Sequence, residues 1–247
     1  MTLAVIGGSG LTRFDELRVM RQEMVKTPYG APSSPVVHGQ LAGQAVVFLA
    51  RHGQGHTIPP HRINYRANLW ALREMGATQV VAVAAVGGIA PTLNPGMVVI
   101  PDQLIDYTHG REMTFYDGDP VRHVDFTAPY DEALRLRLIK AAQGSQVPIH
   151  AEGCYGATQG PRLETGAEIR RMAQDGCTIV GMTGMPEAAL ARELELAYAT
   201  CALVVNKAAG LNNGAPITME AIDIALASGV ESAKQVLKAL LQDQSVQ

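Results

Sequence analysis

The chain is most informative about its fold between Gln79 and Gly88, where it reads Gln-Val-Val-Ala-Val-Ala-Ala-Val-Gly-Gly. An uncharged, valine-rich run that ends in glycine is typical of a β-strand covered on both faces. Comparable apolar runs recur before and after it, separated by loops and helical patterns. The expected strands are Leu3–Ile6, Ala45–Ala50, Gln79–Val86, Met97–Ile100, Gly153–Ala157, Thr178–Met182 and Ala199–Val205.

Helical patterns occupy the intervals between several of these strands. Gly76 and Gly144 are placed to end two helices, Pro186 suits a first helical turn, and Thr218 is a candidate N-cap. Because strands and helices alternate, we predict an α/β fold around one sheet. No repeat, low-complexity tract or linker divides the sequence, so residues 1–247 are expected to form a single domain. The expected helices are Asn64–Met75, Asp131–Gln143, Thr165–Gln174, Pro186–Leu194 and a C-terminal helix from about Thr218.

Composition narrows the class of protein. The 247 residues are 47% hydrophobic, which is enough for a full core, and the formal net charge is −3. This charge excludes a strongly basic nucleic-acid binder and a polybasic membrane surface, so any anionic ligand must be held by a few local groups. Three cysteines without a C-x-x-C pair are typical of a reducing compartment. With no signal peptide or membrane-spanning run in the sequence, we expect a cytoplasmic protein that binds neither nucleic acid nor membrane.

Several well-known ligand motifs are not satisfied. Gly7-Gly8-Ser9-Gly10 follows the first strand, but Arg13 stands where the third glycine of a dinucleotide motif belongs. The sequence contains no Gly-Lys pair for a P-loop. Glycines and prolines separate His52, His56 and His61, so these side chains do not share a helical face and no metal is expected.

Three segments at or just after the ends of expected strands carry residues suited to an anion. Gly7–Gly10 can form a nest of backbone N–H groups with a serine hydroxyl, or simply a tight turn. Arg51-His52 offers a guanidinium and an imidazole to one anion, although an ion pair with a surface carboxylate explains the arginine equally well. Ala84–Gly88 ends its strand in small residues, which permits either close approach of a ligand or close packing.

Three polar side chains stand beside the expected helices and strands. Glu164 lies where a helix opens and can bind a ligand or simply favour the helix dipole. Thr183 brings a hydroxyl near a helix N-terminus, a position that favours anions. Asn206 ends an apolar strand, where a buried amide must be hydrogen-bonded by the protein or by a ligand.

Together these motifs resemble one family. The chain is similar to the trimeric purine nucleoside phosphorylases, and most of all to their methylthioadenosine phosphorylase branch. The resemblance lies in the order Gly-Gly-Ser-Gly, Arg-His-Gly, His-x-Ile-x-Pro-x-x-x-Asn-Tyr-x-Ala-Asn-x-Trp-Ala-Leu, Ala-Val-Gly-Gly, Phe-Tyr-Asp-Gly, Gln-Gly-Pro-Arg-Leu-Glu-Thr, Gly-Met-Thr-Gly-Met-Pro-Glu and Val-Val-Asn. It extends from about Leu3 to the C-terminal helix, and the segments His56–Leu72 and Gln159–Glu187 are specific to the family.

The resemblance implies a mixed, twisted sheet flanked by helices, a homotrimer, and an enzyme that cleaves a purine ribonucleoside with phosphate. It implies no metal and no organic cofactor, since inorganic phosphate is the co-substrate. Ala84 departs from the family, which often has a threonine or another polar residue there. By similarity, Met182 would lie against the ribose, and Arg51, His52 and Asn206 would be catalytic. The groups expected to hold phosphate are Ser9, Arg51, His52, the backbone at Ala85, and Thr183.

The same resemblance indicates which base is cleaved. Adenosine-cleaving members carry Asp-x-Asp where this chain has Asn206, Lys207 and Ala208. Asn206 can accept from N7–H and donate to a 6-oxo group. Glu164 can accept from the N1–H of a 6-oxopurine, a hydrogen that adenine lacks. The expected base is therefore hypoxanthine-like.

The 5′ end of the sugar indicates a second feature of the substrate. Met219 stands where inosine-cleaving members place a histidine for the 5′-hydroxyl, Ile222 lies one turn further, and both suit a methylthio group. His123 of a neighbouring subunit is expected to reach the same pocket. The expected reaction is phosphorolysis of S-methyl-5′-thioinosine. The alternatives are an inosine or guanosine phosphorylase, a methylthioadenosine phosphorylase with a divergent base site, and a nucleoside-binding protein without activity.

Overall fold

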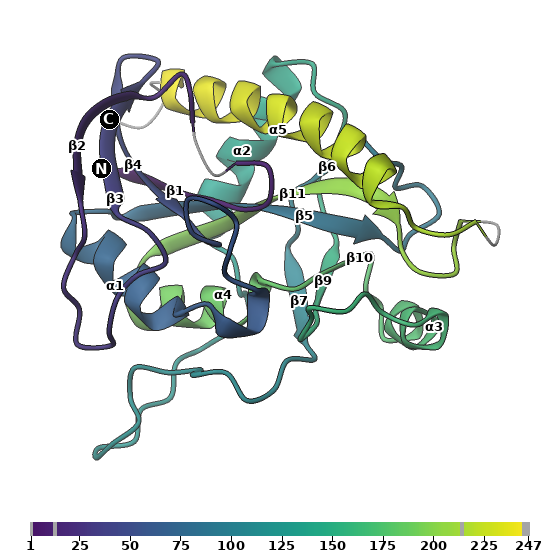
Figure 1. The fold of residues 1–247 in the computed structure, drawn as a ribbon, viewed down its shortest axis with the longest axis horizontal. Helices are drawn as coiled ribbons and strands as arrows, with labels where there is room; N and C mark the ends of the chain where they lie inside the picture. Colours follow the sequence, from purple (N-terminus) through teal and green to yellow (C-terminus); the bar gives the residue numbers. More distant parts are fainter. Residues whose placement is uncertain (1, 12–13, 213–214, 244–247) are drawn as a thin grey trace.

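The computed structural model describes residues 2–11, 14–212 and 215–243, which form one α/β body around a single sheet (Figure 1). Within these ranges the strands are β1 (Leu3–Gly7), β2 (Arg18–Glu23), β3 (Val36–Leu41), β4 (Gln44–Ala50), β5 (Gln79–Gly88), β6 (Val98–Val99), β7 (Gln103–Asp106), β8 (Ile149–His150), β9 (Cys154–Ala157), β10 (Ile179–Gly181) and β11 (Ala197–Lys207). The helices are α1 (Tyr65–Glu74), α2 (Glu132–Gly144), α3 (Gly166–Gln174), α4 (Gly184–Glu193) and α5 (Met219–Gln242), with a short 3₁₀ helix at Pro60–Arg62.

The sheet is mixed, as predicted. Its main path runs β2-β3-β4-β1-β5-β10-β9-β7, while β11 pairs with β5 and β6, and β8 pairs with β6. On one edge, β5 pairs in parallel with β1 as far as Ala82 and in antiparallel fashion with β10 from Gly87. On its other edge it pairs in parallel with β11. The edge of β5 between Ala82 and Gly87 therefore lies between two strands without pairing to either, and the candidate site forms there.

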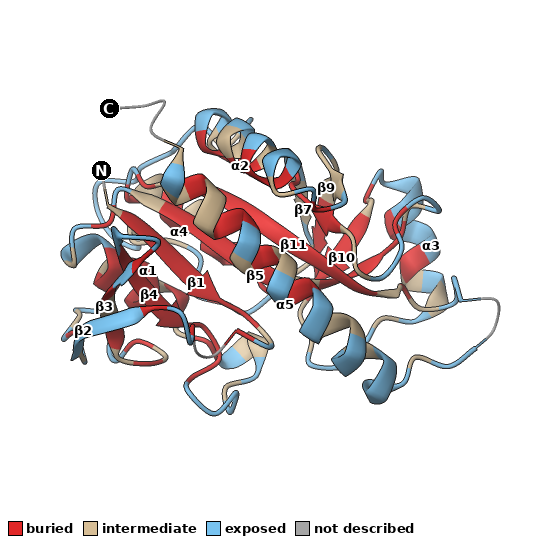
Figure 2. Ribbon diagram, turned by 90° about the horizontal axis from the view of Figure 1, so that it is seen from above, coloured by how far each residue is buried: buried red, intermediate tan, exposed pale blue. Residues whose placement is uncertain are grey.

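Helices cover both faces of the sheet. α1 and α4 pack together on one face, and α2 and α5 pack together on the other (Figures 1 and 2). Alternate residues of β1 enter the two cores, since Ala4 and Ile6 belong to one cluster while Leu3 and Val5 belong to the other. The strands coloured as buried in Figure 2 thus have apolar neighbours above and below. This confirms the prediction of strands covered on both faces.

The helices begin close to the predicted residues because side chains cap them. Thr218 accepts a hydrogen bond from the backbone N–H of Ala221 at 3.3 Å, directly before α5. Thr165 and Glu168 form a reciprocal capping box at the start of α3. In α4 the backbone of Met185 is not helical, so the regular helix begins at Pro186. The five predicted helices are confirmed.

Four strands were not predicted from the sequence: β2, β3, β7 and β8. β2 reads Arg-Val-Met-Arg-Gln-Glu and lies almost wholly exposed at the edge of the sheet. β8 has only two residues. Such segments lack a buried apolar run. They are strands because they pair with a neighbouring strand, and their own sequence pattern does not identify them.

Two observations concern the environment expected for the chain. None of the helices in the described ranges has the length and apolarity that crossing a bilayer requires. Cys177 and Cys201 are buried free thiols, whereas the free thiol of Cys154 is only partly buried.

Candidate active site

A cavity of about 500 Å³ opens beside the unpaired edge of β5. Its wall combines the ends of β4, β5, β10 and β11 with the start of α5, so residues far apart in the sequence meet there. Eleven of the twelve residues expected at the site line it: Ser9, Arg51, His52, Ala85, Glu164, Met182, Thr183, Asn206, Ala208, Met219 and Ile222.

His123 is the residue that the fold does not bring to this cavity. It is exposed in the long segment between β7 and α2, which extends away from the body of the molecule in Figure 1. A single chain therefore leaves His123 outside its own site. Its contact with a neighbouring subunit stays a prediction.

The candidate anion end of the cavity begins at the turn after β1. The backbone N–H of Leu11 donates to the carbonyl of Gly8 at 3.1 Å, and Ser9 lines the cavity. A Cβ on Gly8 would lie 2.5 Å from the carbonyl oxygen of Val83 and 2.9 Å from the Arg51 guanidinium. Only glycine allows this approach to β5. The segment is thus a tight turn that also forms part of the cavity wall.

Arg51 is buried, so its interpretation as half of a surface ion pair is wrong. Its Nε and Nη2 donate to the two carboxylate oxygens of Glu187 at 2.7 and 2.8 Å, and Nη1 donates to the carbonyl of Val83 at 2.9 Å. The hydroxyl of Tyr198 donates to the same carboxylate at 2.8 Å. The Arg51 and Glu187 side chains are 1% and 0% exposed. Glu187 therefore fixes the guanidinium beside the cavity and leaves one hydrogen on each terminal nitrogen for an anion.

His52 is neutral at pH 7. Burial, together with the charge of Arg51, lowers the pKa of His52 to about 4. Its Nδ1 lies 2.8 Å from the carbonyl oxygen of Ile58. A neutral ring must donate from Nδ1 to that carbonyl, so Nε2 is left as an acceptor. Hydrogen phosphate has a P–OH group that could donate to it.

Two of the histidines considered as metal ligands lie close together. The rings of His52 and His56 pack with centroids 4.5 Å apart, although no helix joins them. Among the residues that the structure describes, however, no group of three His, Cys, Asp or Glu side chains is arranged to hold a metal ion.

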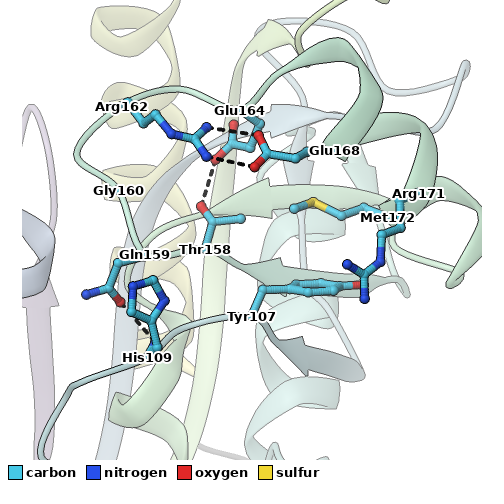
Figure 3. Close-up of a pocket in the computed structure, with 10 residues that line it drawn as sticks. All are labelled: Tyr107, His109, Thr158, Gln159, Gly160, Arg162, Glu164, Glu168, Arg171 and Met172. Atoms are coloured by element: carbon cyan, nitrogen blue, oxygen red, sulfur yellow. Dashed lines mark hydrogen bonds and ion pairs between the residues drawn. The ribbon is translucent and has the colours of Figure 1, made fainter.

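Glu164 lies at the candidate base end of the cavity and is not a helix-capping carboxylate. Thr165 is the N-cap of α3 and Glu168 completes the capping box, so the first-turn interpretation of Glu164 is wrong. The Glu164 Oε1 instead accepts a hydrogen bond from the Thr158 hydroxyl at 2.7 Å (Figure 3). A neighbouring pocket of about 470 Å³ shares Glu164 in its wall and is the one drawn in Figure 3.

Asn206 faces the cavity at an irregularity in β11. The register of β11 against β5 shifts between Val204 and Asn206, and such bulges re-aim a side chain. The Nδ2 of Asn206 donates to the carbonyl of Lys207 at 2.7 Å. This leaves Oδ1 as an acceptor and a second Nδ2 hydrogen as a donor for a ligand. Ala208 is buried in the adjacent wall and adds no polar group.

The remaining end of the cavity is apolar. Met219 and Ile222, one turn apart at the start of α5, line it together with Ile217. Ile222 also packs against the core, but Met219 is 66% exposed. Packing of the helix onto the sheet therefore does not explain Met219.

Arg111 supports the cavity wall without lining the cavity, and the sequence does not indicate this role. It is 9% exposed and holds two cavity segments together. Nη1 donates to the carbonyl of Met182 at 2.9 Å, and Nη2 donates to the carbonyl of Gln159 at 2.9 Å. Nothing in its polar surroundings in the sequence distinguishes it. Glu187 was also given no role, although a carboxylate within the apolar segment Met185–Leu190 was an available signal.

The cavity brings Ser9, Arg51 and His52, whose groups suit an anion, into one wall with the Asn206 amide and the Glu164 carboxylate, which can hydrogen-bond a heterocycle. A nucleoside phosphorylase, an enzyme that transfers a sugar from a base to phosphate, needs both kinds of group. The chain belongs to the phosphorylase superfamily, whose family model matches residues 2–242.

Individual relatives cover nearly all of the chain. A protein of Pseudomonas syringae pv. tomato described as "Probable S-methyl-5'-thioinosine phosphorylase" is 53% identical over 96% of this chain and 97% of its own length. A "6-oxopurine nucleoside phosphorylase" of Pyrococcus furiosus is 46% identical over 96% of this chain and 91% of its own. The solved structure of methylthioadenosine phosphorylase from Schistosoma mansoni in complex with adenine superposes with a TM-score of 0.93 at 33% identity, over 98% of this chain and 91% of that one.

Proposed function

We propose that the enzyme cleaves S-methyl-5′-thioinosine with inorganic phosphate, reversibly, to hypoxanthine and 5-methylthioribose 1-phosphate in purine salvage. One observation carries the proposal: a single cavity joins 6-oxopurine partners, Glu164 and Asn206, to an apolar end at Met219 and Ile222. Relatives at 53% and 52% identity that carry the corresponding name support it.

The base end favours a 6-oxopurine over adenine. The Glu164 carboxylate can accept from N1–H, while Asn206 can accept from N7–H and donate to O6. Adenine offers no hydrogen at N1, so it would leave the second carboxylate oxygen, the one that Thr158 does not bond, without a partner, at a cost of about 1–3 kcal/mol. Ala208 provides no acceptor for a 6-amino group.

The sugar end favours a methylthio group over a hydroxyl. Met219 is 66% exposed in the single chain, so the comparison applies where the neighbouring subunit of the expected trimer covers this pocket. There, a 5′-hydroxyl placed against Met219 and Ile222 without a partner would cost about 1–3 kcal/mol. A methylthio group there would gain on the order of 1 kcal/mol from burial. The two ends together select S-methyl-5′-thioinosine.

The anion end suits a reaction in which positive charge develops on the ribose. Ser9, His52, Thr183, the backbone at Ala85 and the remaining Arg51 hydrogens would bind hydrogen phosphate beneath the sugar. Because Glu187 balances the charge of Arg51, the bound phosphate keeps negative charge with which to stabilise the ribosyl cation. The C1′–N9 electron pair leaves with the base, and a phosphate oxygen bonds to C1′. Hydrogen phosphate gives up one proton to solvent and the base takes one up from solvent at N7, so the protons balance, and Asn206 accepts from the resulting N7–H.

Assembly, cofactors and compartment form part of the same proposal. The enzyme would be a homotrimer in which His123 of a neighbouring copy reaches the 5′ pocket, and light scattering should give the mass of three chains. The reaction would need neither a metal ion nor an organic cofactor, because phosphate is the nucleophile. The cytoplasm would keep the free thiols reduced.

Product analysis tests the proposed activity directly. Purified enzyme is incubated with S-methyl-5′-thioinosine, with and without phosphate, and hypoxanthine and the sugar phosphate are quantified. We expect hypoxanthine to form only with phosphate and in equal amount to the sugar phosphate. Release without phosphate would indicate a hydrolase, and no turnover would indicate a nucleoside-binding protein.

A general 6-oxopurine nucleoside phosphorylase is the second candidate. Its base requirements are the same, and the Pyrococcus furiosus relative carries that name. The apolar contacts of Met219 and Ile222 argue against it, because they provide no partner for a 5′-hydroxyl.

A further inference from the structure

We propose that Thr158 is a specificity-determining residue, because its hydroxyl holds the Glu164 carboxylate as an acceptor and so selects a base with a hydrogen at N1. The inference rests on the proposed function, since it assumes that Glu164 meets the purine N1 position. Thr158 itself acts through Glu164 and is therefore a positioning residue.

The contact that carries the inference is short and largely shielded from water. Thr158 directly follows β9 and is 8% exposed. Its Oγ1 donates to Glu164 Oε1 at 2.7 Å, as the dashed line between the two side chains in Figure 3 shows. A bond of this length from a hydroxyl to a carboxylate is charge-assisted and stronger than one between neutral groups.

Backbone contacts keep the Thr158 hydroxyl in place. Its own N–H donates to the carbonyl of Gly181 at 2.8 Å, and its carbonyl accepts from Arg111 Nη2 at 3.2 Å. Both partners belong to segments that also line or brace the cavity. The hydroxyl is therefore fixed relative to the base site.

The cation two residues before Glu164 in the sequence is held by another carboxylate. Arg162 is engaged by Glu168, with Nη2 and Nη1 donating to its two oxygens at 2.7 and 2.9 Å. Figure 3 shows this fork directed at Glu168 rather than at Glu164. Among the described residues, Thr158 is the side chain that donates a hydrogen bond to Glu164.

The consequence for base recognition follows from counting hydrogens. A threonine hydroxyl has one proton, and two acceptors lie within its reach: Glu164 Oε1 at 2.7 Å and the carbonyl oxygen of Gly181 at 3.2 Å. The shorter, charge-assisted bond to Oε1 is the favoured one, and it leaves Oε2 to accept from the N1–H of a 6-oxopurine. Adenine has a lone pair at N1, so it would require Glu164 as the neutral acid with the proton on Oε2. The bond from Thr158 would then lose its charge assistance. Thr158 thus disfavours the form of Glu164 that a 6-aminopurine needs.

Substitution at Thr158 should change selectivity rather than phosphate binding. In Thr158→Val, which keeps the shape and removes the hydroxyl, we expect the ratio of kcat/KM for S-methyl-5′-thioinosine over methylthioadenosine to fall about tenfold. The KM for phosphate should stay within about twofold of wild type, because Thr158 does not line the anion end. Thr158→Ser should restore the wild-type ratio. If Thr158→Val does not fold, Thr158→Ser and Thr158→Ala give the same comparison, with and without the hydroxyl.

Thr178→Val provides the matched control. Its hydroxyl donates to the backbone carbonyl of Cys154 at 3.3 Å, outside the cavity, so its loss should leave the ratio unchanged. An unchanged ratio in Thr158→Val, with a wild type that prefers the 6-oxo substrate, would overturn the role of Thr158 and leave the proposed function intact. A wild type that prefers methylthioadenosine would instead overturn the proposed function itself.

Discussion

Replacing Glu187 by glutamine tests how strongly the fold depends on the ion pair beneath the anion site. The carboxylate receives two bonds from Arg51, at 2.7 and 2.8 Å, and one from Tyr198 at 2.8 Å, with both charged side chains almost completely buried. Glu187→Gln keeps the shape but removes the charge and turns one acceptor into a donor. An arginine left buried without its partner costs about 3–5 kcal/mol of unfolding free energy. For a chain of this size that lowers Tm by about 6–20 °C.

Phosphate should recover part of this loss if Arg51 belongs to the anion site. In Glu187→Gln the guanidinium lacks a counter-ion, so a bound phosphate becomes its nearest anion. We therefore expect phosphate to raise the Tm of the variant by more than it raises that of wild type. The assay is thermal unfolding with and without phosphate, at matched ionic strength and fixed protein concentration.

Glu168→Gln is the matched control, because Glu168 also holds an arginine with two bonds of similar length but on the surface. Glutamine can still serve in the capping box, so only a small change in Tm is expected. Equal Tm values for the two variants would refute the reasoning from burial. If phosphate raises the Tm of Glu187→Gln and of wild type by the same amount, Arg51 does not belong to the anion site.

Three further outcomes are expected. Asn206→Asp combined with Ala208→Asp should shift kcat/KM toward methylthioadenosine, although incompletely while Glu164 remains, and an unchanged ratio would contradict the assignment of the base end. Met219→His should improve inosine and harm S-methyl-5′-thioinosine, narrowing the difference in kcat/KM about tenfold; no change would place the 5′ group elsewhere. The pKa of His52 is lowered from 6.5 to about 4, so wild type should lose up to about 3 kcal/mol of unfolding free energy as pH falls through this window, relative to His52→Asn. The unfolded histidine takes up a proton there while the folded one stays neutral, and parallel pH profiles for the two proteins would contradict this.

The sequence predicts those strands and helices that a local pattern of residues determines. The apolar run from Gln79 gives β5, and the capping residue Thr218 gives the start of α5. The exposed strand β2 could not be found in this way, because only its pairing with β3 distinguishes it from a loop. Local pattern therefore identifies the buried strands and the capped helices but not the edge of the sheet.

Some residues of the candidate site could likewise be predicted from local sequence, and others could not. Residues in family motifs, such as Ser9 and Asn206, could be assigned to the cavity in advance. Their supporting partners could not, because the contacts span long distances in the chain: Arg51 and Glu187 are 136 residues apart, and Arg111 and Met182 are 71 apart. The sequence shows that an arginine is present but not whether its partner is an anionic ligand, a surface carboxylate or a buried one.

A side-by-side comparison of kcat/KM for S-methyl-5′-thioinosine, inosine and methylthioadenosine at saturating phosphate tests the proposed function most directly. The hydrogen-bonding groups at Glu164 and Asn206 and the apolar end at Met219 predict that S-methyl-5′-thioinosine is preferred over each competitor by about one to three powers of ten. Inosine as good a substrate as S-methyl-5′-thioinosine would contradict the 5′ assignment. Methylthioadenosine as the best of the three would contradict the base assignment, and with it the central claim.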